Sequence, residues 1–182
     1  MKFIILTLVL IFLLNLRAQA DVLQEGWFQV LLGSQHVGYQ TYRYEFDSKK
    51  NQFKFSSFTK TNALGGDFTD SLQATATQGF EPISYQYTSQ VGKDNKLIDA
   101  SFKGDQMTAR IVEKGQTRTE TVKLKKGTFL SYFLIYLALN NKSGLKKGLS
   151  FQYDAIAEED AKVYTGFAEV KDLEKINGHE VF

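Results

Sequence analysis

Residues 39–46 have the sequence YQTYRYEF, in which aromatic and polar side chains alternate. Successive side chains of a β-strand point to opposite faces, so the alternation places Tyr42, Tyr44 and Phe46 on one face and leaves the other face polar. Such a strand is typical of an antiparallel sheet that covers a core with one face and meets water with the other. We therefore expect residues 39–46 to belong to a sheet of this kind.

The same pattern continues on both sides of this segment. Short runs of β-branched and aromatic residues recur at spacings of roughly 8 to 12 residues, separated by Gly, Asn and Asp. The other expected strands are residues 27–32, 52–61, 68–77, 83–89, 96–102, 107–112, 117–124, 149–156, 163–170 and 173–176. The sequence thus predicts a mainly β fold, an antiparallel β-roll or open barrel of about ten strands.

The C-terminal end carries a hairpin signal. Asn177-Gly178, between two β-type runs, predicts a tight turn and a returning strand. The chain ends at Phe182, four residues into that strand. This favours a domain that lacks its last strands, and the alternative is a domain that closes on a short edge strand.

Residues 129–140 break the alternation and predict one helix, with Thr128 as its N-cap. Leu130, Phe133 and Leu137 fall on one helical stripe, and the remaining positions are apolar as well. A helix that is apolar on all sides is usually enclosed, and about 12 residues are too few to cross a membrane. We expect the sheet to wrap around this helix. Its candidate core or ligand-facing side chains are Phe129, Tyr132, Phe133, Tyr136 and Leu137.

The first 20 residues are organised like a secretion signal. Met1-Lys2 is followed by an apolar run over residues 3–16, then by Arg17 and the small-x-small sequence Ala18-Gln19-Ala20. We expect cleavage between Ala20 and Asp21 and a periplasmic or secreted location, with an uncleaved membrane anchor as the alternative. Residues 21–182 would then form a single β-rich domain.

The expected mature chain has no net charge. Removal of the signal takes away Lys2 and Arg17, which leaves 20 basic and 20 acidic residues. A broad positive surface for nucleic acid is therefore absent, and we expect no nucleic-acid partner.

The residue inventory disfavours most catalytic chemistry. The absence of cysteine excludes disulfides, thiol catalysis, thiolate metal sites and a lipid-attachment cysteine. The two histidines, His36 and His179, lie at predicted turns, and Ser34 near His36 lacks the G-x-S-x-G context of a hydrolase nucleophile. We expect no cofactor and no metal, and we expect that the protein is not an enzyme.

One acidic cluster, Glu158-Glu159-Asp160, could supply paired carboxylates for hydrolysis of a glycosidic bond. It lies between two expected strands, where consecutive charges normally solvate a loop. We favour the loop interpretation.

Lysines bracket the apolar segment. No Asp or Glu occurs between Thr121 and Tyr153. The basic residues on both sides of the segment are Lys123, Lys125, Lys126, Lys142, Lys146 and Lys147. Of these, Lys125, Lys126, Lys142, Lys146 and Lys147 are the candidates for docking on an anionic surface such as lipid headgroups or phosphorylated glycans. The alternative is that they only solvate the ends of a buried helix.

Several short motifs occur in order along the chain. They are Gly26-Trp27-Phe28, Val37-Gly38-Tyr39, Lys126-Gly127-Thr128-Phe129-Leu130, Leu145-Lys146-Lys147-Gly148, Phe151-Gln152-Tyr153, residues 166–170, Glu174 and Asn177-Gly178. Together they resemble an exported bacterial β-roll family of the domain-of-unknown-function 3108 type, similar to the module that precedes periplasmic transglutaminase-like domains. The resemblance covers about residues 26–182. It implies a fold and a compartment but no activity, and no transglutaminase-like catalytic set matches because cysteine is absent.

The functional hypothesis is an exported, non-enzymatic envelope module that binds a partner protein or an apolar or envelope-derived ligand, such as a lipid or glycan. Two alternatives are a lipid-binding half-barrel like the lipoprotein carriers and an envelope hydrolase that uses carboxylates.

Overall fold

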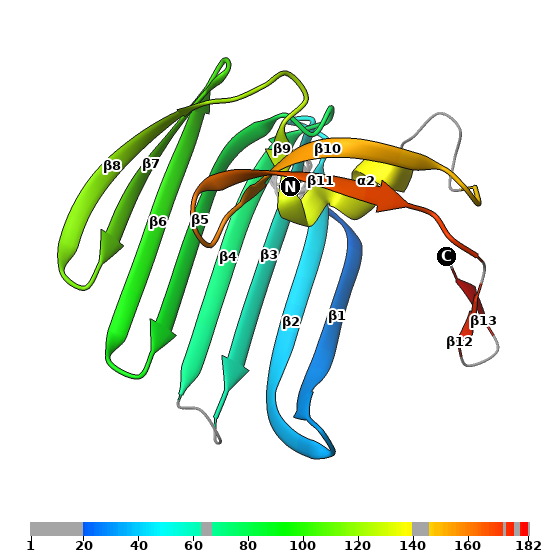
Figure 1. Cartoon of the computed structure of the whole chain (residues 1–182), viewed down its shortest axis with the longest axis horizontal. Coiled ribbons are helices and arrows are strands. Elements are labelled where there is room, and N and C mark those ends of the chain that lie inside the picture. Colours follow the sequence, from blue (N-terminus) through cyan, green and yellow to red (C-terminus); the bar gives the residue numbers. More distant parts are fainter. Residues whose placement is uncertain (1–19, 63–66, 140–145, 173, 177–178, 182) are drawn as a thin grey trace, which may run out of the picture.

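The structure, a computed structural model, describes residues 20–62, 67–139, 146–172, 174–176 and 179–181. Its main part is an eight-stranded antiparallel sheet in which each strand pairs with the next along the chain (Figure 1). The strands are β1 (Asp21–Leu32), β2 (Gln35–Asp47), β3 (Gln52–Thr61), β4 (Phe68–Thr77), β5 (Pro82–Val91), β6 (Asp94–Lys103), β7 (Gln106–Glu113) and β8 (Gln116–Lys123). The sheet does not close, so β1 and β8 are its two edges.

The inner face of this sheet carries the core. One row of cross-strand neighbours consists of Tyr44, Phe55, Ala74, Tyr85, Ala100 and Ala109, and all of them are buried. Every second residue of each strand thus points to the buried inner face, as the alternation in residues 39–46 predicted.

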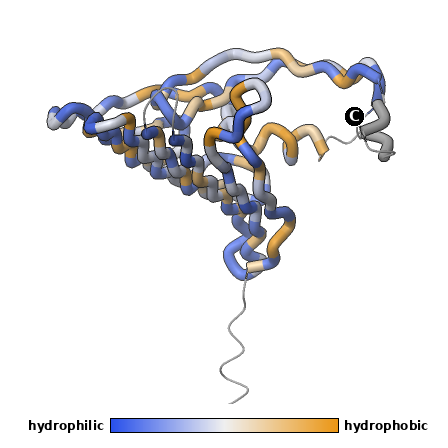
Figure 2. Tube along the Cα trace, turned by 90° about the horizontal axis from the view of Figure 1, so that it is seen from below, coloured by the Kyte–Doolittle hydropathy of each residue, from blue (hydrophilic) through white to orange (hydrophobic). Residues whose placement is uncertain are grey.

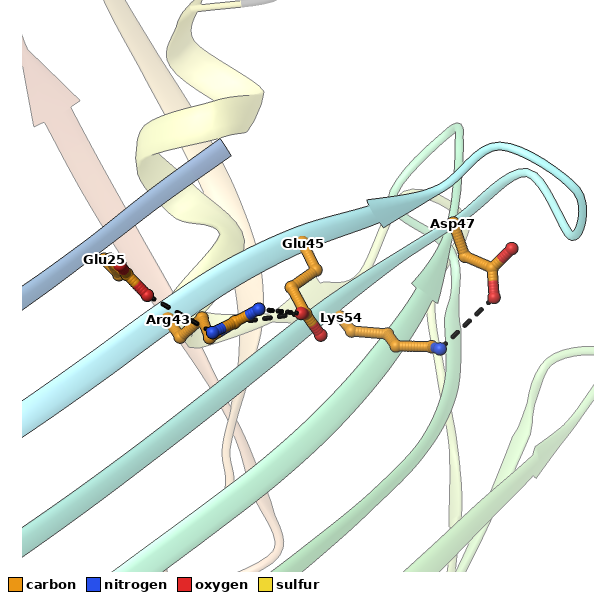
Figure 3. Close-up of polar contacts among 5 residues, drawn as sticks. All are labelled: Glu25, Arg43, Glu45, Asp47 and Lys54. Carbon is orange, nitrogen blue, oxygen red and sulfur yellow. Dashed lines mark hydrogen bonds and ion pairs between the residues drawn. The ribbon is translucent and has the colours of Figure 1, made fainter. Parts of the chain in front are cut away.

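On the outer face, charged side chains of β1, β2 and β3 pair within β2 and with the neighbouring strands (Figure 3). Arg43 lies 2.8 Å from Glu45 and 3.3 Å from Glu25, and Lys54 lies 3.2 Å from Asp47. The polar face expected for the β2 segment is thereby confirmed.

A second layer crosses the inner face. β9 (Phe129–Leu130) pairs in parallel with β10 (Ser150–Ala157), which pairs antiparallel with β11 (Lys162–Glu169). The 3₁₀ turn η1 (Ser131–Phe133) and the helix α2 (Leu134–Leu139) lie between this small sheet and the large one (Figures 1 and 2). β12 (Glu174–Ile176) and β13 (His179–Val181) form a separate hairpin.

Small side chains on the large sheet make room for the second layer. Ala76 and Ala109 belong to the same buried cluster as Leu130, Phe133 and Ile156, which are fully buried. Alanine side chains leave space that the bulky residues of the second layer fill, so the two layers share one core.

The predicted helix over residues 129–140 is wrong at its start. Phe129 and Leu130 form β9, because pairing with β10 satisfies their backbone groups and buries both side chains. The hydroxyl of Thr128 donates to the carbonyl oxygen of Lys125 at 2.9 Å, so it does not cap a helix. Asn140 lies outside the described residues.

The prediction of an enclosed helix is also wrong for α2. None of its residues is fully buried, and Ile135 and Leu139 are 51% and 52% exposed. Within the apolar segment, Phe129, Leu130 and Phe133 are enclosed, whereas Tyr132 is 38% exposed.

All the predicted strands are present, and the mainly β fold is confirmed. β1 begins at Asp21, six residues before the predicted start. The hairpin predicted at the C-terminal end is present as β12 and β13, while Leu173, Asn177 and Gly178 lie outside the described residues. Within the described ranges, no helix is both long enough and apolar enough to span a bilayer.

Candidate functional site

An apolar cleft opens between α2 and the small sheet. One wall consists of Leu134, Ile135 and Ala138, and the opposite wall of Phe151 of β10 and Ala168 of β11. The cleft has a volume of about 660 Å³, within the usual range of small-molecule sites. Polar residues, Ser131, Glu169, Lys171 and Asp172, also line it. The sequence did not predict the cleft, because its two walls come from separate segments of the chain that meet only in the folded structure.

A smaller side hollow of about 290 Å³ lies between α2 and the large sheet. It is lined by Phe28 of β1 and Phe55 of β3, and it shares Tyr44, Tyr132 and Ile135 with the apolar cleft. The Tyr44 hydroxyl donates to the carbonyl oxygen of Tyr132 at 2.7 Å, which ties the helical segment to the sheet. Apolar hollows therefore adjoin this segment on both sides.

The five predicted core or ligand-facing residues occupy different environments. Phe129 and Phe133 are buried, and Phe133 makes ring contacts with Tyr44, Phe53 and Phe80. Tyr132 stacks on Phe55, with ring centroids 4.6 Å apart, and it lines both hollows. Tyr136 and Leu137 are partly buried and pack against the core. Only Tyr132 of the five lines the cleft.

The fold places carboxylates next to several of the predicted docking lysines. Lys125 pairs with Asp154 at 3.1 Å, and Lys147 pairs with Asp172. Lys126 and Lys146 are exposed and form no ion pair within the described ranges. Lys142 lies outside those ranges, and docking on an anionic surface stays a prediction.

The acidic cluster does not simply solvate a loop, so that interpretation is wrong for Glu158. Glu158 is 0% exposed in the turn between β10 and β11. Its Oε2 accepts a hydrogen bond from the Ser131 hydroxyl at 2.6 Å, while Oε1 has no partner among the described residues. Glu159 is exposed, and Asp160 accepts hydrogen bonds from Tyr164 and from the backbone of Lys162.

An acidic hollow of about 260 Å³ adjoins Glu158. Its lining residues are Asp70, Tyr87, Ser131, Tyr132, Glu158 and Glu159. Asp70 comes from β4, so the fold brings it to Glu158 from 88 residues away in the sequence. No local sequence pattern indicates that Asp70 and Glu158 line the same hollow.

Burial is the main cause of the pKa shifts in the acidic hollow, and neighbouring acids add to them. Burial raises the pKa of Glu158 to about 7; the hydrogen bond from Ser131 opposes the rise, and the charge of Glu159 adds to it. Burial also raises the pKa of Tyr132 to about 12, with further contributions from Glu158 and Asp70. The pKa of Tyr87 is raised by burial and then by Asp70 and Glu159, against a hydrogen bond with Ser89.

Among the described side chains, Ser34 and His36 form no hydrogen bond with each other. Ser34 is exposed in the turn after β1, and His36 is exposed near the start of β2. His179 lies in β13, whose side chains are not described. The part of the chain that the structure describes holds no group of three or more His, Cys, Asp or Glu residues that could bind a metal ion.

A hollow of about 710 Å³ lies on the large sheet and is lined by outer-face residues of β1 to β4. The exposed Trp27 lines it together with Phe58. The charged residues in its lining, Glu25 and Arg43, pair with each other (Figure 3). This hollow therefore has little charge left to attract an ionic ligand.

Edge strand β1 exposes an unusual amount of apolar surface. Its large apolar residues Val22, Leu23, Trp27, Phe28, Leu31 and Leu32 are 42% to 59% exposed. Edge strands usually carry charged residues that prevent pairing with other chains, so β1 is a candidate interaction surface.

Comparison with known families gives one match. A family model described as "Protein of unknown function (DUF3108)" matches residues 28–180. No curated protein and no solved structure matches the chain.

Proposed function

This chain belongs to the DUF3108 family of proteins of unknown function, and on that premise we propose that it is an exported, non-enzymatic module that binds the hydrocarbon chain of an envelope amphiphile. The family match confirms that the short motifs resemble the DUF3108 family, while export and the likeness to the module before transglutaminase-like domains stay predictions. The observation that carries the proposed function is the apolar cleft beside α2.

The cleft has the composition that an acyl chain requires. Leu134, Ile135, Ala138 and Phe151 give it apolar walls, while Lys171 and Asp172 provide polar groups that suit a headgroup in water. Burial of hydrocarbon is favourable by roughly 0.8 kcal/mol per methylene group, so a chain of several methylenes could supply useful affinity. The proposal resembles the lipoprotein-carrier alternative in placing lipid between a curved sheet and a helix.

Export is supported by where the fold begins. The apolar N-terminal run ends at a small-x-small sequence, and β1 starts at Asp21, the residue after the predicted cleavage site. Cleavage there would remove no residue of the sheet.

The hydrolase alternative is less well supported. Glu158 with a raised pKa shares the acidic hollow with Asp70, which is the type of carboxylate pairing that glycosidases use. However, about 260 Å³ is below the usual range of roughly 300 to 1,000 Å³ for small-molecule sites. A disaccharide needs more room than this hollow offers, so we favour a non-enzymatic role.

The experiment is a titration of the protein with dansyl-undecanoic acid, followed by displacement with palmitate. We expect saturable binding that Ile135→Asp weakens about tenfold or more, because a charge in the cleft opposes burial of the acyl chain. Leu139→Asp is the matched control, because Leu139 is equally exposed on α2 but lines neither apolar hollow. Ala168→Trp, which narrows the cleft from β11, should also weaken binding.

Two results would contradict the proposal. One is equal affinity of Ile135→Asp, Leu139→Asp and the unaltered chain for the dansyl probe. The other is the absence of any saturable binding.

A partner protein at β1 is the second candidate. It is favoured by the exposed apolar side chains of this edge strand, since the edge also presents unpaired backbone groups to which another strand can bind. The oligomeric state of the purified protein tests whether a second copy is that partner.

A further inference from the structure

One oxygen of the Glu158 carboxylate has no hydrogen-bond donor among the described residues. Ser131 donates to Oε2, but Oε1 is buried and has no partner among the residues that the structure describes. Nearly all buried polar atoms of folded proteins are paired with a protein group, an ordered water or a bound ion, so Oε1 calls for a partner of one of these kinds. The hydroxyl of Tyr85 is also buried without a partner, and Glu158 contributes to its raised pKa, although burial is the main cause.

The acidic hollow beside Glu158 contains further carboxylates. Asp70 comes from β4 and Glu159 from the β10–β11 turn. Asp160 of the same turn does not line the hollow, and it pairs with Lys162 at 3.9 Å. The titratable groups that face Glu158 from β5 and η1 are the tyrosines Tyr85, Tyr87 and Tyr132. None of the residues that line the acidic hollow is Lys, Arg or His.

We propose that the acidic hollow binds an organic cation through a primary ammonium or guanidinium group. Its charge offsets the carboxylates of Asp70 and Glu159, and a rotation of the enclosed Glu158 carboxylate would let the N–H groups of the cation supply the donor that Oε1 lacks. The rings of Tyr87 and Tyr132 add cation–π attraction. This inference does not depend on the apolar cleft or on the amphiphile.

The observations favour an organic cation over a metal ion. A divalent cation requires several oxygen ligands at short range, and the described residues contain no group of three or more acidic or histidine side chains so arranged. Two tyrosine rings in the lining suit a planar or compact organic cation better than a metal. The volume of about 260 Å³ fits a single charged group with a short stem.

The experiment is an NMR titration of the protein with ethylguanidinium and with its neutral isostere ethylurea. At pH 8 we expect saturable binding of ethylguanidinium, at least about tenfold tighter than that of ethylurea, because only the cation pairs with the carboxylates. The affinity should fall several-fold at pH 5.5, since a proton on Glu158 then competes with the ligand.

Variants locate the binding. Glu158→Gln keeps the side-chain size and an acceptor for Ser131, and we expect it to weaken ethylguanidinium binding about tenfold or more. Asp70→Asn should also weaken ethylguanidinium binding. This second variant tests the proposal if Glu158→Gln fails to fold. Glu81→Gln is the matched control, because Glu81 is exposed and outside the hollow.

Three results would overturn the inference. The first is equal binding of ethylurea and ethylguanidinium. The second is unchanged affinity in the folded carboxylate variants. The third is calcium chloride binding to the same residues more tightly than ethylguanidinium, which would make the hollow a metal site.

Discussion

Glu158 makes the stability of the fold depend on pH. Burial raises its pKa from 4.5 to about 7, so the folded chain keeps a proton that the unfolded chain releases between these values. The stabilisation linked to this proton is complete below the unfolded pKa and is lost as the pH rises through about 7. The shift corresponds to roughly 3 kcal/mol of unfolding free energy.

We expect Glu158→Gln to remove this dependence, because glutamine is neutral at every pH. The variant should be more stable than the unaltered protein by about 1 to 3 kcal/mol at pH 8, and the difference should shrink towards pH 5. Urea unfolding at a series of pH values measures it, with Glu81→Gln as control. Parallel pH profiles for Glu158→Gln and the unaltered protein would refute the assignment.

Two glycines of the N-terminal motifs are explained by close approaches between strands. A Cβ on Gly38 would meet the backbone carbonyl oxygen of Lys60 on β3, closer than real Cβ atoms come. A Cβ on Gly26 would lie 2.5 Å from the ring of Tyr42, which is stacked on Phe28. These motif residues therefore serve the packing of β1 to β3.

We expect Gly38→Ala to lower the free energy of unfolding by about 1 to 3 kcal/mol, because backbone cannot move aside as a side chain can. Gly79→Ala is the control: its nearest atom would be 3.7 Å away, so the change should stay within about 0.5 kcal/mol. Chemical denaturation measures both. Equal effects of the two substitutions would show that the strands at Gly38 are not tightly apposed.

At the scale of elements, the strands could be predicted because alternation is a local property. The predicted ranges 52–61 and 68–77 coincide with β3 and β4. The first six residues of β1 were missed because residues 21–26 hold only two apolar side chains, and pairing with β2 makes them a strand.

The apolar segment could not be predicted in the same way. Residues 129–139 are apolar at nearly every position, so their pattern does not distinguish a strand from a helix. Phe129 and Leu130 form a strand because they pair in parallel with β10, about 26 residues further along the chain.

The candidate sites are formed by residues that are far apart in the sequence and close together in the fold. The acidic hollow joins Asp70 of β4 to the turn after β10, and consecutive acids in a turn normally face water. The apolar cleft likewise exists only where α2 meets β10 and β11. Local patterns therefore predicted the strands of this protein better than the hollows between its elements.

At the scale of the whole molecule, the two edges of the large sheet differ in chemistry. β8 is protected by charge: Arg118 lies 2.8 Å from Glu120 and 3.4 Å from Glu113 on the neighbouring strand. β1 instead exposes apolar side chains along its length and carries only the acids Asp21 and Glu25. The open sheet is thus blocked against further pairing at one edge only.

This asymmetry predicts a dimer in which β1 pairs antiparallel with β1 of a second copy, because a strand related to itself by a two-fold axis is self-complementary. Sedimentation velocity should show concentration-dependent dimerisation. Combined Trp27→Lys and Leu31→Lys substitutions should weaken it at least about tenfold, since they place like charges at the new contact. Thr119→Lys on the opposite edge should leave it unchanged. A purified chain that stays monomeric at all concentrations would show that another protein, or none, covers this edge.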